Sequence, residues 1–155
     1  MKKFILSIDQ GTTSSRVVLY DHKFIIKDIA QKEFKQYFPQ DGWVEHNAEE
    51  IWLDVKKLIN LIIKRNKLKP SKIISIGITN QRETTVLWNK KTGKPIYKAI
   101  VWQDRRTANY CDKLKSNKKD RIIQKITGLV LDPYFSATKI NWILNNIPKK
   151  NIGQI

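Results

Sequence analysis

Residues 4–21 read FILSIDQGTTSSRVVLYD, and this stretch decides the fold. It places two apolar runs, Phe4–Asp9 and Arg16–Asp21, on either side of a short polar turn that contains Gly11. Apolar runs of this length, bounded by turn residues, are typical of β-strands. A third strand with looser patterning is expected over Phe24–Phe34. The sequence therefore predicts an antiparallel meander at the start of the chain.

A long amphipathic helix is expected next, after a loop over residues 35–46. Asn47 is a candidate N-cap with Glu50 three residues on, and apolar side chains then recur at helical spacing. Pro70 ends this region, and the nearly all-apolar run Ile73–Thr79 favours a central strand buried on both faces. Strand, long helix and strand form a crossover unit, so we expect a mixed sheet.

The second half of the chain changes from strands to helices. Two further strands are expected over Thr84–Trp88 and Ile96–Val101, joined by a turn with Gly93. Helices are expected near residues 105–116, 119–126 and 136–147, with Ser136 as the candidate N-cap of the last. The pattern as a whole predicts an α/β domain with flanking helices.

Composition excludes several classes of protein. The 155 residues carry a net charge of +16 and contain one cysteine and two histidines, so an internal disulfide and a multi-cysteine metal site are excluded. No apolar run has the length of a membrane span or a signal sequence, which predicts a cytoplasmic protein without a membrane partner. The lysines are spread along the chain, which favours a solvated surface over a nucleic-acid interface, although the charge permits either.

The turn after the first strand is the strongest candidate for binding chemistry. Asp9 ends the strand, Gly11 permits a tight turn, and hydroxyl side chains fill positions 12–15. Main-chain N–H groups and hydroxyls in such a turn can bind an anion. A carboxylate beside a phosphate requires a cation between them, which indicates Mg²⁺ near Asp9. An ordinary polar hairpin explains the same residues.

Three later segments suggest a polyol site. Arg82 and Glu83 follow a strand end, where a planar donor and a carboxylate could share vicinal hydroxyls, or form only a surface ion pair. Trp102 precedes Asp104 and could lie against the carbons of a polyol or pack in the core. Tyr134 could offer a hydroxyl or act as a hydrophobic staple. Asp104 could equally be an N-cap, with Arg105 and Arg106 solvated.

Taken in order, these segments resemble the sugar-kinase family with the ribonuclease-H-like, actin-like fold, and within it the N-terminal part of the glycerol kinases. The matching blocks are DQGTTSSR (9–16), GWVEH (42–46), GITNQRET (77–84), TGKPIY (92–97), AIVWQDRR (99–106) and GLVLDPYFS (128–136). They span nearly the whole chain, with the weakest fit over 107–126 and in the C-terminal tail.

The resemblance implies phosphorylation of a terminal hydroxyl of glycerol by MgATP in a cleft between two domains. It implies that Asp9 lies near the metal and that four residues meet the phosphates of ATP: Thr12, Thr13, Ser14 and Arg16. It also implies a glycerol site made by Arg82, Glu83 and Tyr134, with Trp102 against the carbons. These roles agree with those suggested by the residues alone.

One departure from the family is serious. Such kinases are much longer, and their general base lies beyond the position of Ile155, so no catalytic residue is assigned. We expect residues 1–155 to be a partial N-terminal domain without its second domain, inactive alone. The expected protein partners are a second copy in a homo-oligomer or the missing C-terminal half, which could be encoded separately and reassemble with it. The alternative is a basic, non-catalytic remnant that binds nucleic acid or a partner subunit.

Overall fold

The computed structural model describes residues 3–148, which divide into two compact units. Among these described residues, the strand unit comprises residues 3–35 and Glu49–Gln81, and the helical unit comprises Gln36–Ala48 and residues 82–148. The elements of the strand unit are β1 (Phe4–Gln10), β2 (Ser14–Asp21), β3 (Ile26–Glu33), α1 (Ala48–Arg65), a 3₁₀ turn (Pro70–Lys72) and β5 (Ile73–Thr79). Those of the helical unit are β4 (Glu45–His46), β6 (Ala99–Ile100), α2 (Ala108–Ser116), α3 (Lys119–Thr127) and α4 (Ser136–Asn146).

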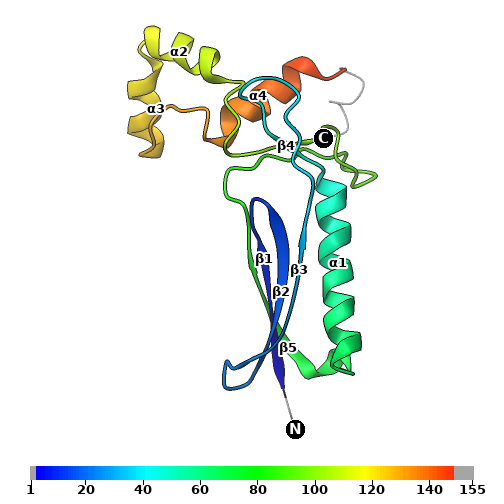
Figure 1. Ribbon diagram of the computed structural model, residues 1–155. Coiled ribbons are helices and arrows are strands. Elements are labelled where there is room, and N and C mark those ends of the chain that lie inside the picture. Colours follow the sequence, from blue (N-terminus) through cyan, green and yellow to red (C-terminus); the bar gives the residue numbers. More distant parts are fainter. Residues whose placement is uncertain (1–2, 149–155) are drawn as a thin grey trace. The chain divides into compact units, whose positions relative to one another are not determined.

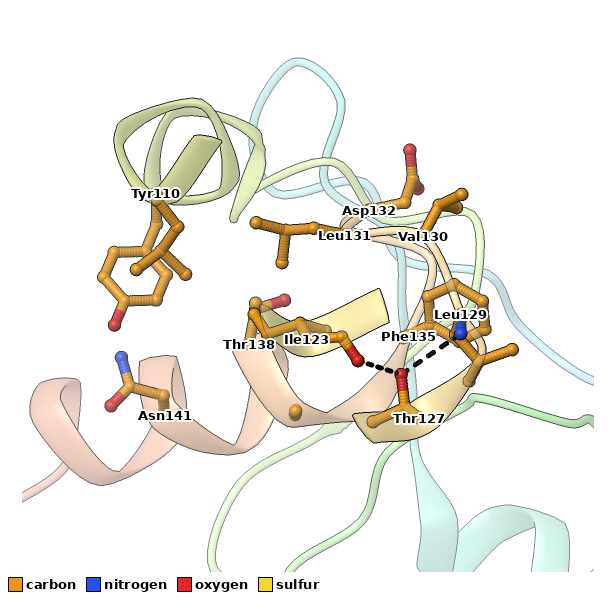
Figure 2. A pocket seen from close by; sticks show the side chains of 12 residues that line it. Tyr110, Ile123, Thr127, Leu129, Val130, Leu131, Asp132, Phe135, Thr138 and Asn141 are labelled. Carbon is orange, nitrogen blue, oxygen red and sulfur yellow. Dashed lines mark hydrogen bonds between the residues drawn. The ribbon is translucent and has the colours of Figure 1, made fainter. Parts of the chain in front are cut away.

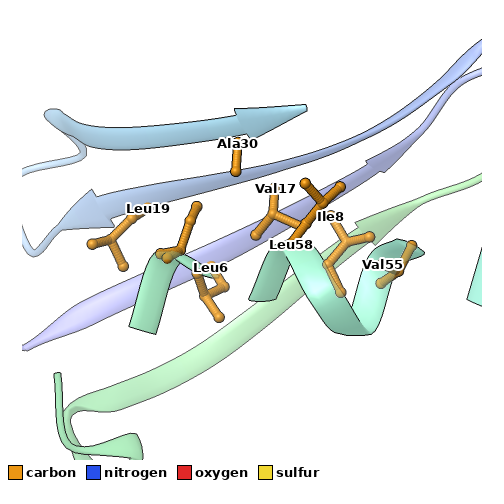
Figure 3. Close-up of a cluster of buried hydrophobic side chains, with 8 residues drawn as sticks. Leu6, Ile8, Val17, Leu19, Ala30, Val55 and Leu58 are labelled. Atoms are coloured by element: carbon orange, nitrogen blue, oxygen red, sulfur yellow. The ribbon is translucent and has the colours of Figure 1, made fainter. Parts of the chain in front are cut away.

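The strand unit is a four-stranded mixed sheet covered on one face by α1 (Figure 1). The strand order is β3-β2-β1-β5, with β1, β2 and β3 antiparallel and β5 parallel to β1. This confirms the predicted meander and crossover. Alternate residues of the strands meet the apolar stripe of α1 in the core (Figure 3): Leu6, Ile8, Val17, Leu19 and Ala30 against Val55, Leu58 and Ile62. Burial of these side chains is the main stabilising contribution in the unit.

The prediction that Ile73–Thr79 is a central strand buried on both faces is wrong. β5 lies at one edge of the sheet, and most of its residues are exposed, including Ile76 and Ile78. Those two residues pair with Leu6 and Ile8, so they continue the apolar face of the sheet. The stripe of α1 packs over β1, β2 and Ala30 of β3, and Ile73 at the start of β5 packs against this core. The same face is left uncovered over the rest of β5 among the described residues.

The helical unit contains far less strand than the sequence predicted. Residues expected to form strands over 84–88 and 96–101 make only the two-residue β6 and isolated bridges, such as Thr85 with Ile100. β6 pairs instead with β4, inside the segment expected to be a loop. The predicted turn is confirmed, because the Gly93 N–H donates to the carbonyl of Asn89 and Gly93 adopts a positive φ of 68°.

Helices α2, α3 and α4 are confirmed, although α2 begins three residues later than expected. Aromatic rings pack beside α4, where Trp142 contacts Trp43 and Tyr97 edge-to-face. The side chain of Trp52 in α1 is exposed. Among residues 3–148, no helix combines the length and apolar character needed to cross a membrane.

Candidate functional site

The β1–β2 turn brings the first group of predicted site residues together. Main-chain hydrogen bonds fix the turn, with Gly11 N–H donating to the carbonyl of Ser14 at 3.0 Å. A Cβ added at Gly11 would lie 3.3 Å from that same carbonyl oxygen, a tighter contact than usual, so a larger residue would shift the turn by a few tenths of an ångström. The Ser14 hydroxyl accepts a hydrogen bond from the amide of Gln31 in β3 at 3.0 Å. The neighbouring strand therefore holds one of the predicted phosphate ligands in place.

Asp9 and Arg16 are cross-strand partners in this hairpin. Both Nε and Nη2 of Arg16 donate to Oδ2 of Asp9, at 3.2 and 2.5 Å, and both side chains are partly exposed. Residues 3–148 contain no cluster of three His, Cys, Asp or Glu side chains that could hold a metal by themselves. A single carboxylate still fits Mg²⁺, which usually keeps several waters and takes its remaining ligands from substrate phosphates.

Glu83 lies at the centre of the second group, in the helical unit. Its main chain adopts a left-handed conformation with φ of 64°, which is uncommon for a residue other than glycine. Its Oε2 accepts hydrogen bonds from the Ser136 N–H at 3.0 Å and the Ser136 hydroxyl at 2.9 Å. The other carboxylate oxygen, Oε1, has no hydrogen-bond partner within the described residues. Glu83 is therefore oriented by α4 and keeps one acceptor for a ligand.

The carboxylate of Glu83 also corrects the predicted cap of α4. Ser136 is the first residue of the helix, and the N-cap position is Phe135, which makes no side-chain capping bond. The first turn of a helix has N–H groups without intrahelical acceptors, and a carboxylate is a favourable acceptor there. Glu83 supplies that acceptor from a distant loop, so Ser136 donates instead of capping.

Trp102 and Tyr134 belong to the same group. Their rings contact edge-to-face with centroids 5.9 Å apart, and Tyr134 contacts Phe135 in the same way at 5.2 Å. The Tyr134 N–H donates to Asp132 at 2.8 Å, which fixes the segment before α4. Arg82 is exposed, next to Glu83 in the chain, and its side chain makes no hydrogen bond or ion pair with the described residues.

Sequence reasoning missed two buried cations. Arg106, expected to be solvated, has a side chain with no exposed surface and donates to Asp104 and Glu45 at 2.8–2.9 Å. Its guanidinium carbon also lies 3.8 Å from the centroid of the Trp43 ring. Burial opposes its charge, yet the hydrogen bonds to Asp104 and Glu45 leave the pKa of Arg106 above its ordinary value. Nothing in the sequence distinguishes Arg106 from the neighbouring Arg105, which is exposed.

Asp104 is correspondingly not an N-cap. Its Oδ2 accepts from the Val44 N–H at 2.6 Å, while α2 begins only at Ala108 after Thr107. The second missed cation is Lys139 in α4, which is completely buried. Cys111, the single cysteine, is buried, and burial raises the pKa of its thiol, which fits an inert side chain.

The helical unit also holds an apolar cavity of about 400 Å³ between α2, α3 and α4 (Figure 2). Leu129, Leu131 and Phe135 line it, with Tyr110 and Asn141 at one end. None of the predicted site residues lines it. The predicted residues thus form two groups, one in the strand unit at the β1–β2 turn and one in the helical unit around Glu83.

Comparisons with known proteins define the class. Residues 4–153 match the FGGY family of carbohydrate kinases, N-terminal domain. The chain belongs to this family of kinases, and its mixed sheet with flanking helices confirms the predicted fold class.

Within this family, the chain is similar to glycerol kinases. The chain is 58% identical over 145 residues to a glycerol kinase of Borrelia duttonii, covering 94% of this chain and 29% of the relative. It is 55% identical over 147 residues to a glycerol kinase of a Geobacillus species, covering 95% and 30%. The chain therefore spans about 30% of the length of the curated relatives it matches.

Solved structures of sugar and polyol kinases superpose closely on this chain. A glycerol kinase from Plasmodium falciparum, crystallised with ADP, superposes with a TM-score of 0.87 at 40% identity, over 95% of this chain and 29% of that one. A gluconate kinase from Lactobacillus acidophilus gives a TM-score of 0.86 at 22% identity, over 99% of this chain and 30% of that one, which shows a shared fold alone.

Proposed function

We propose that this chain supplies the N-terminal domain of a two-domain kinase that phosphorylates glycerol to glycerol 3-phosphate with MgATP. The observation that carries the proposal is the arrangement around Glu83. One carboxylate oxygen is held by α4 while the other is open, and Trp102 and Tyr134 form a ring pair in the same unit. The identities of 55–58% to glycerol kinases support glycerol as the polyol.

Each group in this site has a distinct chemical task. Arg82 is a donor only, and Glu83 as a carboxylate is an acceptor only, so together they can satisfy a hydroxyl that both accepts and donates. The Tyr134 hydroxyl would bind a further hydroxyl, and the face of Trp102 would cover the carbons. This division of tasks orients one terminal hydroxyl of a three-carbon alcohol for transfer.

The β1–β2 turn is the proposed site for the ATP phosphates, through Thr12, Thr13, Ser14 and Arg16. The tight turn at Gly11 and the bond from Gln31 to Ser14 support it, because both hold donors in place before ligand arrives. Mg²⁺, held through Asp9, would neutralise charge on the transferred phosphoryl group. Phosphoryl transfer depends on positioning and charge neutralisation, which these residues would provide.

No residue of 1–155 is assigned as the general base, and we propose that the chain binds ligands without turning them over alone. A second domain of different sequence, whether part of a longer chain or a separate subunit, would complete the site. The cytoplasmic location expected from the sequence stays a prediction. A coupled assay that detects ATP-dependent glycerol phosphorylation by the purified 155-residue chain would contradict this part of the proposal.

The direct test is a glycerol titration of the purified chain followed by amide chemical shifts. We expect saturable shifts near Glu83 and Trp102, and a loss of affinity of about tenfold or more in Arg82→Ala, the range for a hydrogen bond to a charged group. Arg121→Ala is the matched control, because Arg121 is also exposed but lies in α3. A folded sample that shows no glycerol-dependent shift would overturn the proposed site.

A second titration tests the nucleotide group. MgATP should shift the amides of residues 11–16, and omission of Mg²⁺ or Arg16→Ala should weaken that response. The alternative, a basic remnant that binds nucleic acid, predicts an affinity for DNA or RNA that falls steeply with salt. An affinity of that kind, together with no response to glycerol or MgATP, would favour the remnant over the kinase.

A further inference from the structure

Lys139 is an unusual residue within the helical unit. It lies on α4, three residues after Ser136, and its side chain has no exposed surface. Lysine is rarely buried completely, because removing an ammonium group from water costs much free energy unless its charge is compensated. A buried lysine that the hydrophobic core does not require is therefore a candidate for a specific task.

The contacts of Lys139 identify that task. Its Nζ donates to the main-chain carbonyl of Glu83 at 3.2 Å and to that of Tyr134 at 2.5 Å. Within residues 3–148 it forms no ion pair with any carboxylate. Its charge is thus used to hold two main-chain carbonyls, and both belong to residues proposed to bind glycerol.

The contact with Glu83 falls where the main chain needs support. A left-handed φ at a residue other than glycine costs on the order of 1 kcal/mol and persists only where neighbours hold it. Ser136 and Lys139 are three apart and so lie on one side of α4. The first holds the carboxylate of Glu83, and the second holds its carbonyl. The helix therefore fixes both ends of this residue.

We propose that Lys139 is a positioning residue, whose ammonium group fixes the main chain at Glu83 and Tyr134 so that their side chains meet glycerol hydroxyls in one fixed arrangement. This inference rests on the proposed function. Lys139 is not proposed to touch the ligand. It acts through the two residues that do, and its effect on binding comes from restricting their conformations before glycerol arrives.

The charge state of Lys139 gives the proposal a pH signature. Burial lowers the pKa of Lys139 to about 8, while Asp104, Glu83 and Asp132 act to raise it and Arg106 acts to lower it. Deprotonation removes the charge assistance from both carbonyl bonds, and such bonds are roughly twice as strong as neutral ones. Glycerol affinity should therefore fall as the pH rises through about 8.

The test uses Lys139→Met, which keeps most of the side-chain volume and removes the donor. Amide hydrogen exchange at Ser136 reports directly on the hold on Glu83, because that N–H donates to its carboxylate. In Lys139→Met we expect the Ser136 amide to exchange at least tenfold faster and the glycerol Kd to rise by about tenfold. The glycerol affinity of this variant should no longer fall as the pH rises above 8.

Thr107→Val is the matched control. The Thr107 hydroxyl is buried in the same unit and bonds to Thr138 of α4 at 2.9 Å, but among the described residues it makes no hydrogen bond to Glu83 or Tyr134. We expect this variant to lose stability. Its glycerol affinity should stay as in the unaltered chain, and so should the exchange rate at Ser136 relative to the rest of the unit. If Lys139→Met behaves like this control, the positioning role is refuted.

The outcomes separate this inference from the proposed function. An unaltered chain that fails to bind glycerol would overturn the proposed function, and the exchange at Ser136 would still test whether Lys139 holds Glu83. If the unaltered chain binds glycerol, but no more tightly than Lys139→Met does, the positioning role is refuted and the proposed function stands. If Lys139→Met does not fold, the pH dependence of glycerol affinity in the unaltered chain decides, and a flat profile from about pH 7 to well above the pKa of Lys139 would refute the proposal.

Discussion

Replacing Arg106 with methionine should strongly destabilise the helical unit, because it leaves two buried carboxylates without their shared cation. The guanidinium of Arg106 hydrogen-bonds both Glu45 and Asp104, whose side chains are 4% and 0% exposed. The substitution also removes the stacking of the guanidinium on Trp43. Removing one partner of a buried ion pair typically costs about 3–5 kcal/mol, because the other charge stays buried without compensation.

The remaining contacts place the cost toward the lower end of that range. Asp104 keeps hydrogen bonds from the N–H groups of Val44 and residue 106, at 2.6 and 2.9 Å. Glu45 keeps the Tyr97 hydroxyl at 2.8 Å. We therefore expect a loss of about 3 kcal/mol in the free energy of unfolding. In the triple variant with Glu45→Gln and Asp104→Asn, much of this loss should be recovered, because none of these three positions then holds a buried charge.

Urea denaturation, with amide exchange at Ile100 and Val101 to localise the effect, measures this loss. Arg105→Met is the matched control: its side chain is 56% exposed and pairs with a partly exposed Asp132, so at most about 1 kcal/mol is expected. A loss below about 1 kcal/mol in Arg106→Met, or no recovery in the triple variant, would contradict the account of a buried network.

Two further predictions concern acid sensitivity and the core. Burial lowers the pKa of His46 from 6.5 to about 4, so folding favours the neutral ring and the stabilisation is lost as pH falls from 6.5 to 4. The loss in the free energy of unfolding should be on the order of 3 kcal/mol. Acid denaturation of His46→Gln, compared with that of the unaltered chain, should lack this contribution. In the strand unit, Leu6→Ala should cost about 2–5 kcal/mol by urea denaturation, whereas Ile78→Ala should change stability by less than about 1 kcal/mol, since Leu6 is buried and Ile78 is 73% exposed. Equal effects of the two substitutions would show that the face of β5 is covered in solution.

The strand unit was predictable because its signals are local. Alternating apolar residues and short turns specify β1, β2 and β3, and the stripe before Pro70 specifies α1. The position of β5 was not predictable in the same way. An all-apolar run indicates a strand with two apolar faces, but it does not say which segment covers them. The described residues cover neither face of most of β5, so the pattern was interpreted correctly as a strand and wrongly as a buried one.

The helical unit was harder because its strands are defined by partners far away in sequence. Thr85 pairs with Ile100, and Glu45 pairs with Ile100 from the other side, so neither segment has a hairpin signal of its own. The two buried cations were missed for a similar reason. A lysine or arginine in a sequence looks solvated by default, and only the fold shows that Arg106 is enclosed by acidic and aromatic side chains.

The residues that were predicted and those that were missed form one physical arrangement in the helical unit. Motif reasoning identifies Glu83 and Tyr134, which offer groups to a ligand, because such groups are restricted in chemical type. It does not identify Lys139, which offers nothing to a ligand and holds only main-chain carbonyls, a task with no sequence signature. Main-chain carbonyls are present at every residue, so any donor placed near them by the fold can serve. Support for a site is therefore visible only in the folded chain, and the positive φ of Glu83 is the observation that shows where that support is needed.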